Sequence, residues 1–236
     1  MNTVANATLA PGTALPFAGG VVTGYPATLA GQPIPTNYIL RGIDMVSPSL
    51  GWAVGTNNPD NQHGILLKYM AGQWVDIGIH DVHSINSVFM NSADEGWAVG
   101  SQGDIIHYNG DQWSKAANFV DQQLNSVSLT AVGEGWAVGN GGLILSLHGG
   151  KWAKYPLSPT NENLRTVYMI SAAEGWAVGG EDGGGVFIHY KDGKWGRELA
   201  KVDGADIKGY PATLYMLSPD QGWAFCNRGY IMQYST

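Results

Sequence analysis

The chain repeats one alternation of apolar and polar positions five times. Each copy centres on the word GWAVG, found at residues 51–55, 96–100, 135–139 and 175–179, with the variant GWAFC at 222–226. Nine and seven residues before each tryptophan of the word stands an apolar side chain, as in INSVFMNS and LRTVYMIS. This alternation predicts a β-strand that buries one face. The five tryptophans lie 45, 39, 40 and 47 residues apart, so each copy is a unit of about 40 residues.

Three more strands are predicted in each copy, and we name the four a, b, c and d in chain order. The word itself forms strand b. Strand c follows in the apolar segments ILLKYM, DIIHYN, LILSLH, VFIHYK and YIMQYS. Strand d opens six residues after a fixed position of strand c, at Trp74, Trp113, Trp152 and Trp195. A four-stranded antiparallel unit cannot bury both of its faces alone, so repeated units pack side by side around an axis.

The predicted fold class is therefore all-β, a five-bladed β-propeller that forms a single domain over residues 1–236. The blades are expected at about residues 38–80, 81–119, 120–159, 160–203 and 204–236. The fifth copy stops after strand c. Part of residues 3–30, within the N-terminal segment 1–37, is predicted to supply its strand d and to close the ring, which would remove an open sheet edge.

The word GWAVG is interpreted as packing, not as chemistry. Its first glycine follows a tight turn between strands a and b. The tryptophan is expected to cover the neighbouring blade, and the small residues after it let two blades approach closely.

Composition narrows the function classes. Charged residues make up 13% and hydrophobic residues 44%, with 34 Gly, which suits many short strands joined by turns. A formal net charge of −7 argues against nucleic acid as a partner. The sequence has no apolar run long enough to span a membrane. A lone Cys226 leaves the redox compartment open.

The first 40 residues carry no charged side chain. They lack the basic start of a signal peptide, and they are similar to the uncharged linkers that follow export signals in bacterial surface proteins. An extracellular or periplasmic location is therefore expected.

The repeat GWAVGNGGLILSLHGGKW resembles propellers of the sialidase-like superfamily, above all the photosystem II assembly and stability factor group. The resemblance covers about residues 38–236. It departs from that family in two ways, because only Asp192–Gly193 keeps the acid of the family's Asp-box turn and because the family resembles seven-bladed rings, against five units here.

A binding site is expected on the face that carries the b–c and d–a loops, where all variation in loop length falls. Variable loops on a constant scaffold often carry function, although drift at tolerant loop tips is the alternative. The enlarged loops are 56–63, 180–185 and 200–211. They supply as ligand-binding candidates Asn57, Asn58, Asp60, Glu181, Asp182, Lys208 and Tyr210.

Arginines gather at the same face. Arg41 and Arg165 occupy equivalent positions eleven residues before the motif tryptophan, and Arg228 lies in the last b–c loop. Guanidinium groups at the channel mouth could bind a carboxylate or phosphate, since arginine presents a planar fork of donors. The alternative is that these arginines pair with Asp44 or Glu162 and only stiffen the mouth.

A glycoside hydrolase is the second hypothesis, with Asp44 as its candidate catalytic residue. It lacks a matching second acid in another blade, and glycosidases use two carboxylates. His80 and His83 could share a metal, but such loop pairs are usually solvated, so no metal and no cofactor are predicted. The preferred hypothesis is a monomeric, non-catalytic binding or scaffolding module whose ligand is a glycan or a protein.

Overall fold

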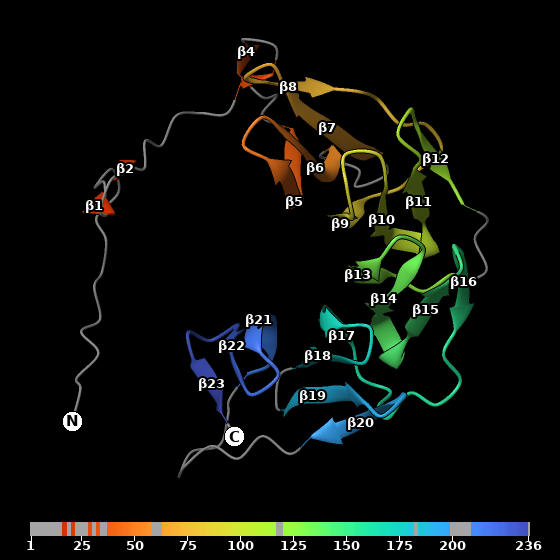
Figure 1. The fold of residues 1–236 in the computed structure, drawn as a ribbon, viewed down its shortest axis with the longest axis vertical. Coiled ribbons are helices and arrows are strands. Elements are labelled where there is room, and N and C mark those ends of the chain that lie inside the picture. The colour runs from red at the N-terminus through yellow and green to blue at the C-terminus, as the bar shows by residue number, and fades with distance from the viewer. Residues whose placement is uncertain are drawn as a thin grey trace.

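The structure is a computed structural model of the chain. It describes residues 16–17, 20–21, 28–29, 32–33, 37–57, 63–116, 120–181, 184–198 and 209–235. These residues form sheets joined by turns, all of whose pairings are antiparallel except the one between β3 and β8, and three of the sheets have four strands in chain order. The described part of the chain contains no helix long and apolar enough to cross a membrane. Five sheets follow one another as blades, so the chain is a β-propeller (Figure 1).

The first four blades run outward from strand a to strand d, and the described part of the fifth runs from strand a to strand c. The first blade contains β5 (Tyr38–Ser47), β6 (Leu50–Asn57), β7 (Gly64–Met70) and β8 (Gln73–Asp76). The second contains β9 (Ile85–Met90), β10 (Gly96–Gly100), β11 (Ile105–Tyr108) and β12 (Trp113–Lys115). The third contains β13 (Leu124–Ala131), β14 (Glu134–Gly139), β15 (Ile144–His148) and β16 (Lys151–Lys154). The fourth contains β17 (Leu164–Ser171), β18 (Glu174–Glu181), β19 (Gly184–Lys191) and β20 (Lys194–Glu198). The fifth contains β21 (Pro211–Ser218), β22 (Gln221–Cys226) and β23 (Ile231–Ser235).

The blades follow an arc, with β5 near one end and β21 to β23 at the other (Figure 1). Each inner strand contacts the inner strand of the next blade, from β5 to β9, β13, β17 and β21. The b–c turns of the second and third blades contain the short 3-10 helices η1 (Ser101–Gly103) and η2 (Asn140–Gly142). All these turns lie on the face where the inner strands begin, because a and c run in the same direction in an antiparallel blade.

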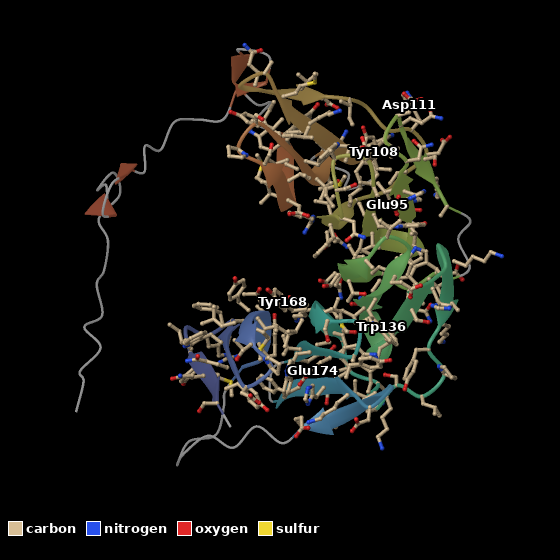
Figure 2. The ribbon with its side chains drawn as sticks, viewed as in Figure 1. Glu95, Tyr108, Asp111, Trp136, Tyr168 and Glu174 are labelled. Atoms are coloured by element: carbon tan, nitrogen blue, oxygen red, sulfur yellow. The ribbon has the colours of Figure 1, made fainter. Side chains whose placement is uncertain are left out.

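The motif tryptophan joins each blade to the next one. Trp52 lies with its ring centroid 5.2 Å from that of Tyr108, and Trp176 lies 4.6 Å from Tyr234. Trp136 lies 4.7 Å from Tyr190, at the junction of the third and fourth blades (Figure 2). In every case the partner ring belongs to strand c of the following blade. The predicted packing role of the tryptophan is therefore confirmed for these blades.

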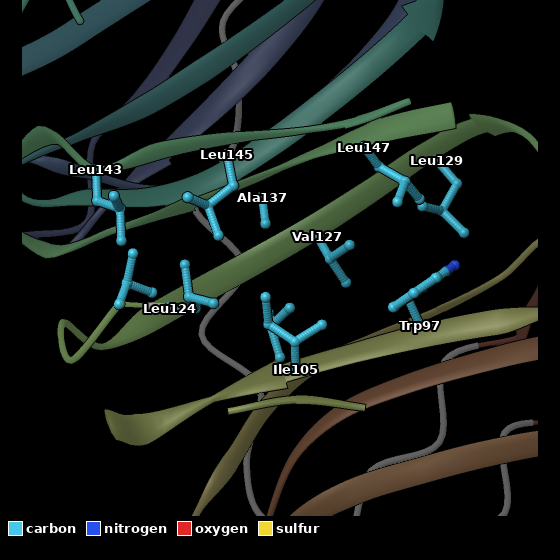
Figure 3. Close-up of a cluster of buried hydrophobic side chains, with 11 residues drawn as sticks. Trp97, Ile105, Leu124, Val127, Leu129, Ala137, Leu143, Leu145 and Leu147 are labelled. Carbon is cyan, nitrogen blue, oxygen red and sulfur yellow. The ribbon is translucent and has the colours of Figure 1, made fainter. Parts of the chain in front are cut away.

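The core is a series of apolar layers between successive blades. Between the second and third blades, Trp97 and Ile105 face Leu124, Val127 and Leu145 (Figure 3). Ile105, Leu124 and Leu145 are fully buried. Because each layer draws side chains from two blades, no blade has a complete core of its own.

Side chains of strand a also bond to the main chain of the next blade. The main-chain N–H of Val127 donates to Ser87 Oγ at 3.3 Å, and that of Val167 donates to Ser126 Oγ at 3.2 Å. The two serines occupy the same register position in adjacent blades. These bonds fix the height of one blade against the next and thereby align the loops at the face above.

The predicted closing strand is not confirmed. The described strands β1 (Pro16–Phe17) and β2 (Gly20–Val21) pair with each other, and β3 (Thr28–Leu29) pairs with β4 (Gln32–Pro33). Strand β3 also pairs with β8, through Leu29 and Trp74, which places it on the outer edge of the first blade. The prediction is therefore wrong for Thr28–Leu29, since their main chain is engaged at the opposite end of the arc. Within 3–30, Pro16–Phe17 and Gly20–Val21 pair with each other among the described strands, and the other residues apart from Thr28–Leu29 lie outside the described residues.

Candidate functional site: the loop face

The loop face is the surface formed by the starts of the inner strands and the b–c turns. At the starts of the inner strands, side-chain hydrogen bonds connect one blade to the next. The side-chain amide of Asn86 donates to the carbonyl of Leu124 at 2.7 Å, and that of Asn125 donates to the carbonyl of Leu164 at 2.7 Å. Both asparagines stand eleven residues before their motif tryptophan, so the same repeat position makes the same bond twice. These two amides are structural.

Arg165 occupies this position in the fourth blade, and there the contact changes. Its guanidinium carbon lies 3.9 Å from the centroid of the Tyr210 ring. The arginine Nε atom is buried and has no hydrogen-bond partner among the described residues. Stacking on an aromatic face holds a guanidinium flat and leaves its N–H groups in the ring plane free to donate. Arg165 is therefore held in place with a donor that this part of the chain does not satisfy.

Tyr210 is itself fixed by the b–c turn of the fifth blade. Its N–H donates to Asn227 Oδ1 at 3.0 Å, and the N–H of Asn227 donates to the carbonyl of Tyr210 at 3.0 Å. The neighbouring Arg228 is exposed in the same turn. These two hydrogen bonds hold the segment of Tyr210 against the turn that carries Arg228. Two arginines from different blades, Arg165 and Arg228, therefore lie on one part of the loop face.

Polar contacts continue from this cluster along the rim. The side-chain amide of Asn163 donates to Glu181 Oε1 at 2.9 Å, and the N–H of Gly141 in η2 donates to Asn163 Oδ1 at 2.9 Å. The chain of contacts joins the b–c turns of the third and fourth blades. Glu181 is thus a member of a polar network and not an isolated acid at a loop tip.

The structure gathers some predicted ligand-binding residues and separates others. Arg165 and Tyr210 touch, and Glu181 and Arg228 lie on the same face in the fourth and fifth blades. Arg41 is exposed on β5 at the other end of the arc. Asn57 ends β6 in the first blade, and its side-chain oxygen is buried without a partner among the described residues. Outside the described residues lie Asn58, Asp60, Asp182 and Lys208.

The alternative pairing with Asp44 or Glu162 is not found for Arg41 and Arg165 among the described residues. Asp44 accepts the main-chain N–H of Met90 at 2.6 Å, and Glu162 lies 3.8 Å from Arg197 in the outer strand. Among the ion pairs between described residues, none contains Arg41 or Arg165.

Asp44, the candidate catalytic residue, occupies a structural position. In the third blade Ser128 stands at the same register position, and its Oγ accepts the N–H of Met169 at 3.0 Å, just as Asp44 accepts that of Met90. Burial raises the pKa of the Asp44 carboxyl, against the lowering effect of its bonds to the N–H groups of Met90 and Met45. The repeated contact explains the carboxylate as an acceptor between blades, which weakens the hydrolase hypothesis.

Of the two candidate metal-binding histidines, His83 contacts a buried carboxylate of the propeller and His80 does not. Nδ1 of His83 lies 3.0 Å from the carboxylate of Asp104, which is buried and which Lys115 Nζ approaches to 2.6 Å. His80 is exposed and is not part of this cluster. The described residues contain no group of three or more acidic, histidine or cysteine side chains suited to a metal ion.

Sequence reasoning missed Asn163 and Asn227, which organise the rim around Arg165 and Tyr210. Asn163 does not recur at its position in the other blades, so the alignment of the repeats gives no sign of it. Asn227 aligns with Asn140 of the third blade, whose N–H donates to the carbonyl of Gln123 just as that of Asn227 donates to Tyr210, so a comparison of the b–c turns could have found it.

The comparisons with known proteins give the fold. No family model and no curated protein matches the chain. Among solved structures, YCF48 from Cyanidioschyzon merolae overlaps with a TM-score of 0.62 at 17% identity, covering 86% of this chain and 69% of that chain. U3-55K overlaps with a TM-score of 0.68 at 10% identity, covering 92% and 68%. The WD40 β-propeller domain of Doa1 overlaps with a TM-score of 0.63 at 13% identity, covering 84% and 66%. At these identities the likeness shows a β-propeller, while the narrower resemblance to sialidase-like repeats stays a prediction.

Proposed function

We propose that the chain is a non-catalytic scaffolding propeller that binds a protein partner on the loop face, at Arg165 and Tyr210. The observation that carries the proposal is the buried Nε of Arg165, a fixed donor without a partner among the described residues. A buried donor without an acceptor costs free energy, and a carboxylate of a bound partner would satisfy it in a charge-assisted bond.

The polar rim supports a protein ligand more than a small molecule. Asn163 bonds to Glu181, and Asn227 bonds to Tyr210, so the surface on this side of the loop face is polar and held in place. Interfaces of this kind place a few anchors inside a rim of polar contacts. The partner is expected to present an acidic side chain or a terminal carboxylate to Arg165.

Selection from a random peptide library displayed on phage tests the proposal. The full chain should enrich peptides that contain Asp, Glu or a free carboxyl end, and the Arg165→Gln variant should lose this enrichment. Arg197→Gln is the matched control, because Arg197 lies on the outer strand β20 and is half-exposed, with a distant acid at 3.8 Å. Equal enrichment by wild type and Arg165→Gln would refute the site.

The two other hypotheses predict different results. A glycan ligand would give signal on a glycan array that Asn57→Ala abolishes, and a hydrolase would turn over aryl glycosides in a manner that Asp44→Asn abolishes. The scaffolding proposal expects neither. The extracellular or periplasmic location and the monomeric state remain predictions from the sequence.

A further inference from the structure

The sequence contains two Asn-Gly pairs, and the structure holds them differently. Asn109–Gly110 lies in the c–d turn of the second blade, between β11 and β12, and Asn140–Gly141 lies in η2 on the loop face. An asparagine side chain can react with the main-chain nitrogen of the next residue, and a glycine at that place has no side chain to block the approach. These two pairs are therefore the positions where the sequence itself resists this reaction least.

At Asn140 the reacting groups are occupied. The N–H of Gly141, which would supply the attacking nitrogen, donates to Asn163 Oδ1 at 2.9 Å. The side-chain oxygen of Asn140 accepts the amide of Asn125 at 2.9 Å, and the same amide donates to the carbonyl of Leu164 in the next blade. Attack at this pair therefore requires that the hydrogen bond of Gly141 is broken first, so the fold protects Asn140.

At Asn109 the arrangement favours the reaction. The N–H of Gly110 makes no hydrogen bond with any of the described residues. The side-chain oxygen of Asn109 accepts two main-chain N–H groups, from Asp111 at 3.1 Å and from Gln112 at 3.0 Å. This oxygen takes up negative charge when a nitrogen attacks Cγ, and fixed N–H donors stabilise charge that develops in a transition state. The turn thus places an oxyanion hole around its own asparagine.

The same turn is held in place and is open to water. The hydroxyl of Tyr108 donates to the carbonyl of Gly110 at 2.9 Å, which fixes the main chain next to the reacting nitrogen. The side chain of Asn109 is exposed, and Asp111 lies at the periphery of the molecule (Figure 2). The second reactant, water, therefore has access to the turn.

We propose that Asn109 is a site of spontaneous deamidation in the folded protein. The Gly110 nitrogen forms a bond to Cγ of Asn109, and the bond from Cγ to Nδ2 breaks. The proton of the Gly110 nitrogen ends on the departing ammonia, and a cyclic succinimide remains. Water then adds to one of the two ring carbonyls, breaks its bond to the ring nitrogen and returns a proton to that nitrogen. Opening at Cγ gives aspartate, and opening at the main-chain carbonyl gives isoaspartate.

The products place a negative charge in an acidic turn. The new carboxylate stands beside Asp111 in the sequence, and Gly110 packs against Asp94, since a Cβ atom at Gly110 would lie 3.2 Å from the Asp94 Cβ. Like charges at short distance repel. Isoaspartate also lengthens the main chain by one atom, which displaces the acceptor from the N–H groups of Asp111 and Gln112. Both products therefore strain the turn.

The strain acts next to the junction of the first and second blades. The ring of Tyr108 lies with its centroid 5.3 Å from that of Trp113 and 5.2 Å from that of Trp52 in the first blade. The deamidated fraction, separated by anion exchange, is therefore expected to unfold at a lower temperature than the amide form. The c–d turns lie on the face opposite the loop face, so the site is independent of Arg165.

Peptide mapping by mass spectrometry tests the proposal. The folded full chain is kept at alkaline pH, where the Gly110 nitrogen loses its proton more readily, and the gain in mass from amide to acid is located along the sequence over time. Asn109 should convert at least about ten times faster than Asn140, because Gly141 must first break a hydrogen bond. In concentrated urea the two pairs should convert at similar rates.

Two variants separate the geometry from the sequence. Asn163→Ala removes the acceptor of the Gly141 N–H, so conversion at Asn140 should rise several-fold while conversion at Asn109 stays the same. Asn109→Gln should remove the signal at that position, because the larger ring that glutamine would form closes much more slowly.

Three results would overturn the proposal. Asn109 and Asn140 could convert at equal rates in the folded chain, or Asn109 could convert only in urea. Asn163→Ala could also leave Asn140 unchanged, which would show that the hydrogen bonds do not decide the rates. None of these measurements involves peptide binding, so failure of the proposed function at Arg165 is distinguishable from failure here.

Discussion

The interfaces inside the arc and the two end faces use the same repeat positions but expose them differently. Nine residues before the motif tryptophan, the side chain is 7% exposed at Val88, 4% at Val127 and Val167, and 6% at Leu214. At the same position of the first blade, Ile43 is 63% exposed. The residue type hardly changes, so the neighbour on that side decides the burial.

The other end of the arc shows the same effect on its opposite face. Tyr215 is 53% exposed and Phe225 is 47% exposed, whereas Val178, which aligns with Phe225, is 1% exposed. A blade thus carries two apolar faces and needs a neighbour on each side. Stability is expected to reside in the interfaces, and the end blades are expected to be the least stable part of the molecule.

Two methionines at equivalent positions should show the largest effect of this difference on stability. Met90 and Met45 stand seven residues before their motif tryptophans, and they are 7% and 42% exposed. Met90→Ala should cost about 2–5 kcal/mol of unfolding free energy, because it leaves a cavity in a closed layer. Met45→Ala should cost less than about 1 kcal/mol. Urea unfolding of both variants measures the two values, and equal costs would contradict the role of the neighbouring blade.

The last residue of the repeated word gives a second matched pair. A Cβ atom at Gly139 would collide with the main-chain carbonyl of Gln123, whereas the fifth blade accommodates the side chain of Cys226 at the same position. Gly139→Ala should therefore cost about 1–3 kcal/mol through overpacking. Cys226→Ala should cost less than Gly139→Ala in the same thermal or urea unfolding series. The reverse order would show that the fifth blade is packed as tightly as the third.

The side-chain acceptors between blades should both contribute to stability. Ser128→Ala removes the acceptor of the Met169 N–H and should cost about 1 kcal/mol, and Asp44→Ala, which removes the acceptor of the N–H groups of Met90 and Met45, should cost at least as much. Asp44→Asn keeps an oxygen in place and should cost less than Asp44→Ala. If Asp44→Asn lost as much stability as Asp44→Ala, the hydrogen bond to Met90 would not explain this residue.

The smallest effect is a pH dependence at Asp44. Burial raises the pKa of its carboxyl above the usual 3.8, so the folded chain binds this proton more tightly than the unfolded chain. The stability from this proton is fully present below pH 3.8 and is lost as the pH rises through the folded pKa. Relative to Asp44→Asn, the wild type should therefore gain stability as the pH falls from 7 to below 4. A relative loss over that range would contradict the sign of the shift.

The fold could be predicted because its constraints repeat. Alternating strands, the tight turns and the tryptophan of each copy recur at fixed spacings, so five weak patterns reinforce one another. The closing strand could not be predicted in this way. It depends on where a segment without repeats finds a partner edge, and Leu29 lies beside Trp74 at the first blade instead.

The candidate site was predictable only in part. The position of Arg165 at the start of an inner strand follows from the alignment, and so does the face on which it lies. Its stacking on Tyr210 does not follow, because Asn86 and Asn125 at the same position bond to a main-chain carbonyl. A cavity beside Tyr234 draws its walls from two blades, so no single repeat predicts it.

Amide hydrogen exchange along the inner strands tests the central claim most directly, namely that each blade is stabilised by a neighbour on both sides. Exchange of the full chain should be slower in β9, β13 and β17, which contact the inner strands of two neighbouring blades, than in β5. Equal protection of β5 and β13 would contradict the claim.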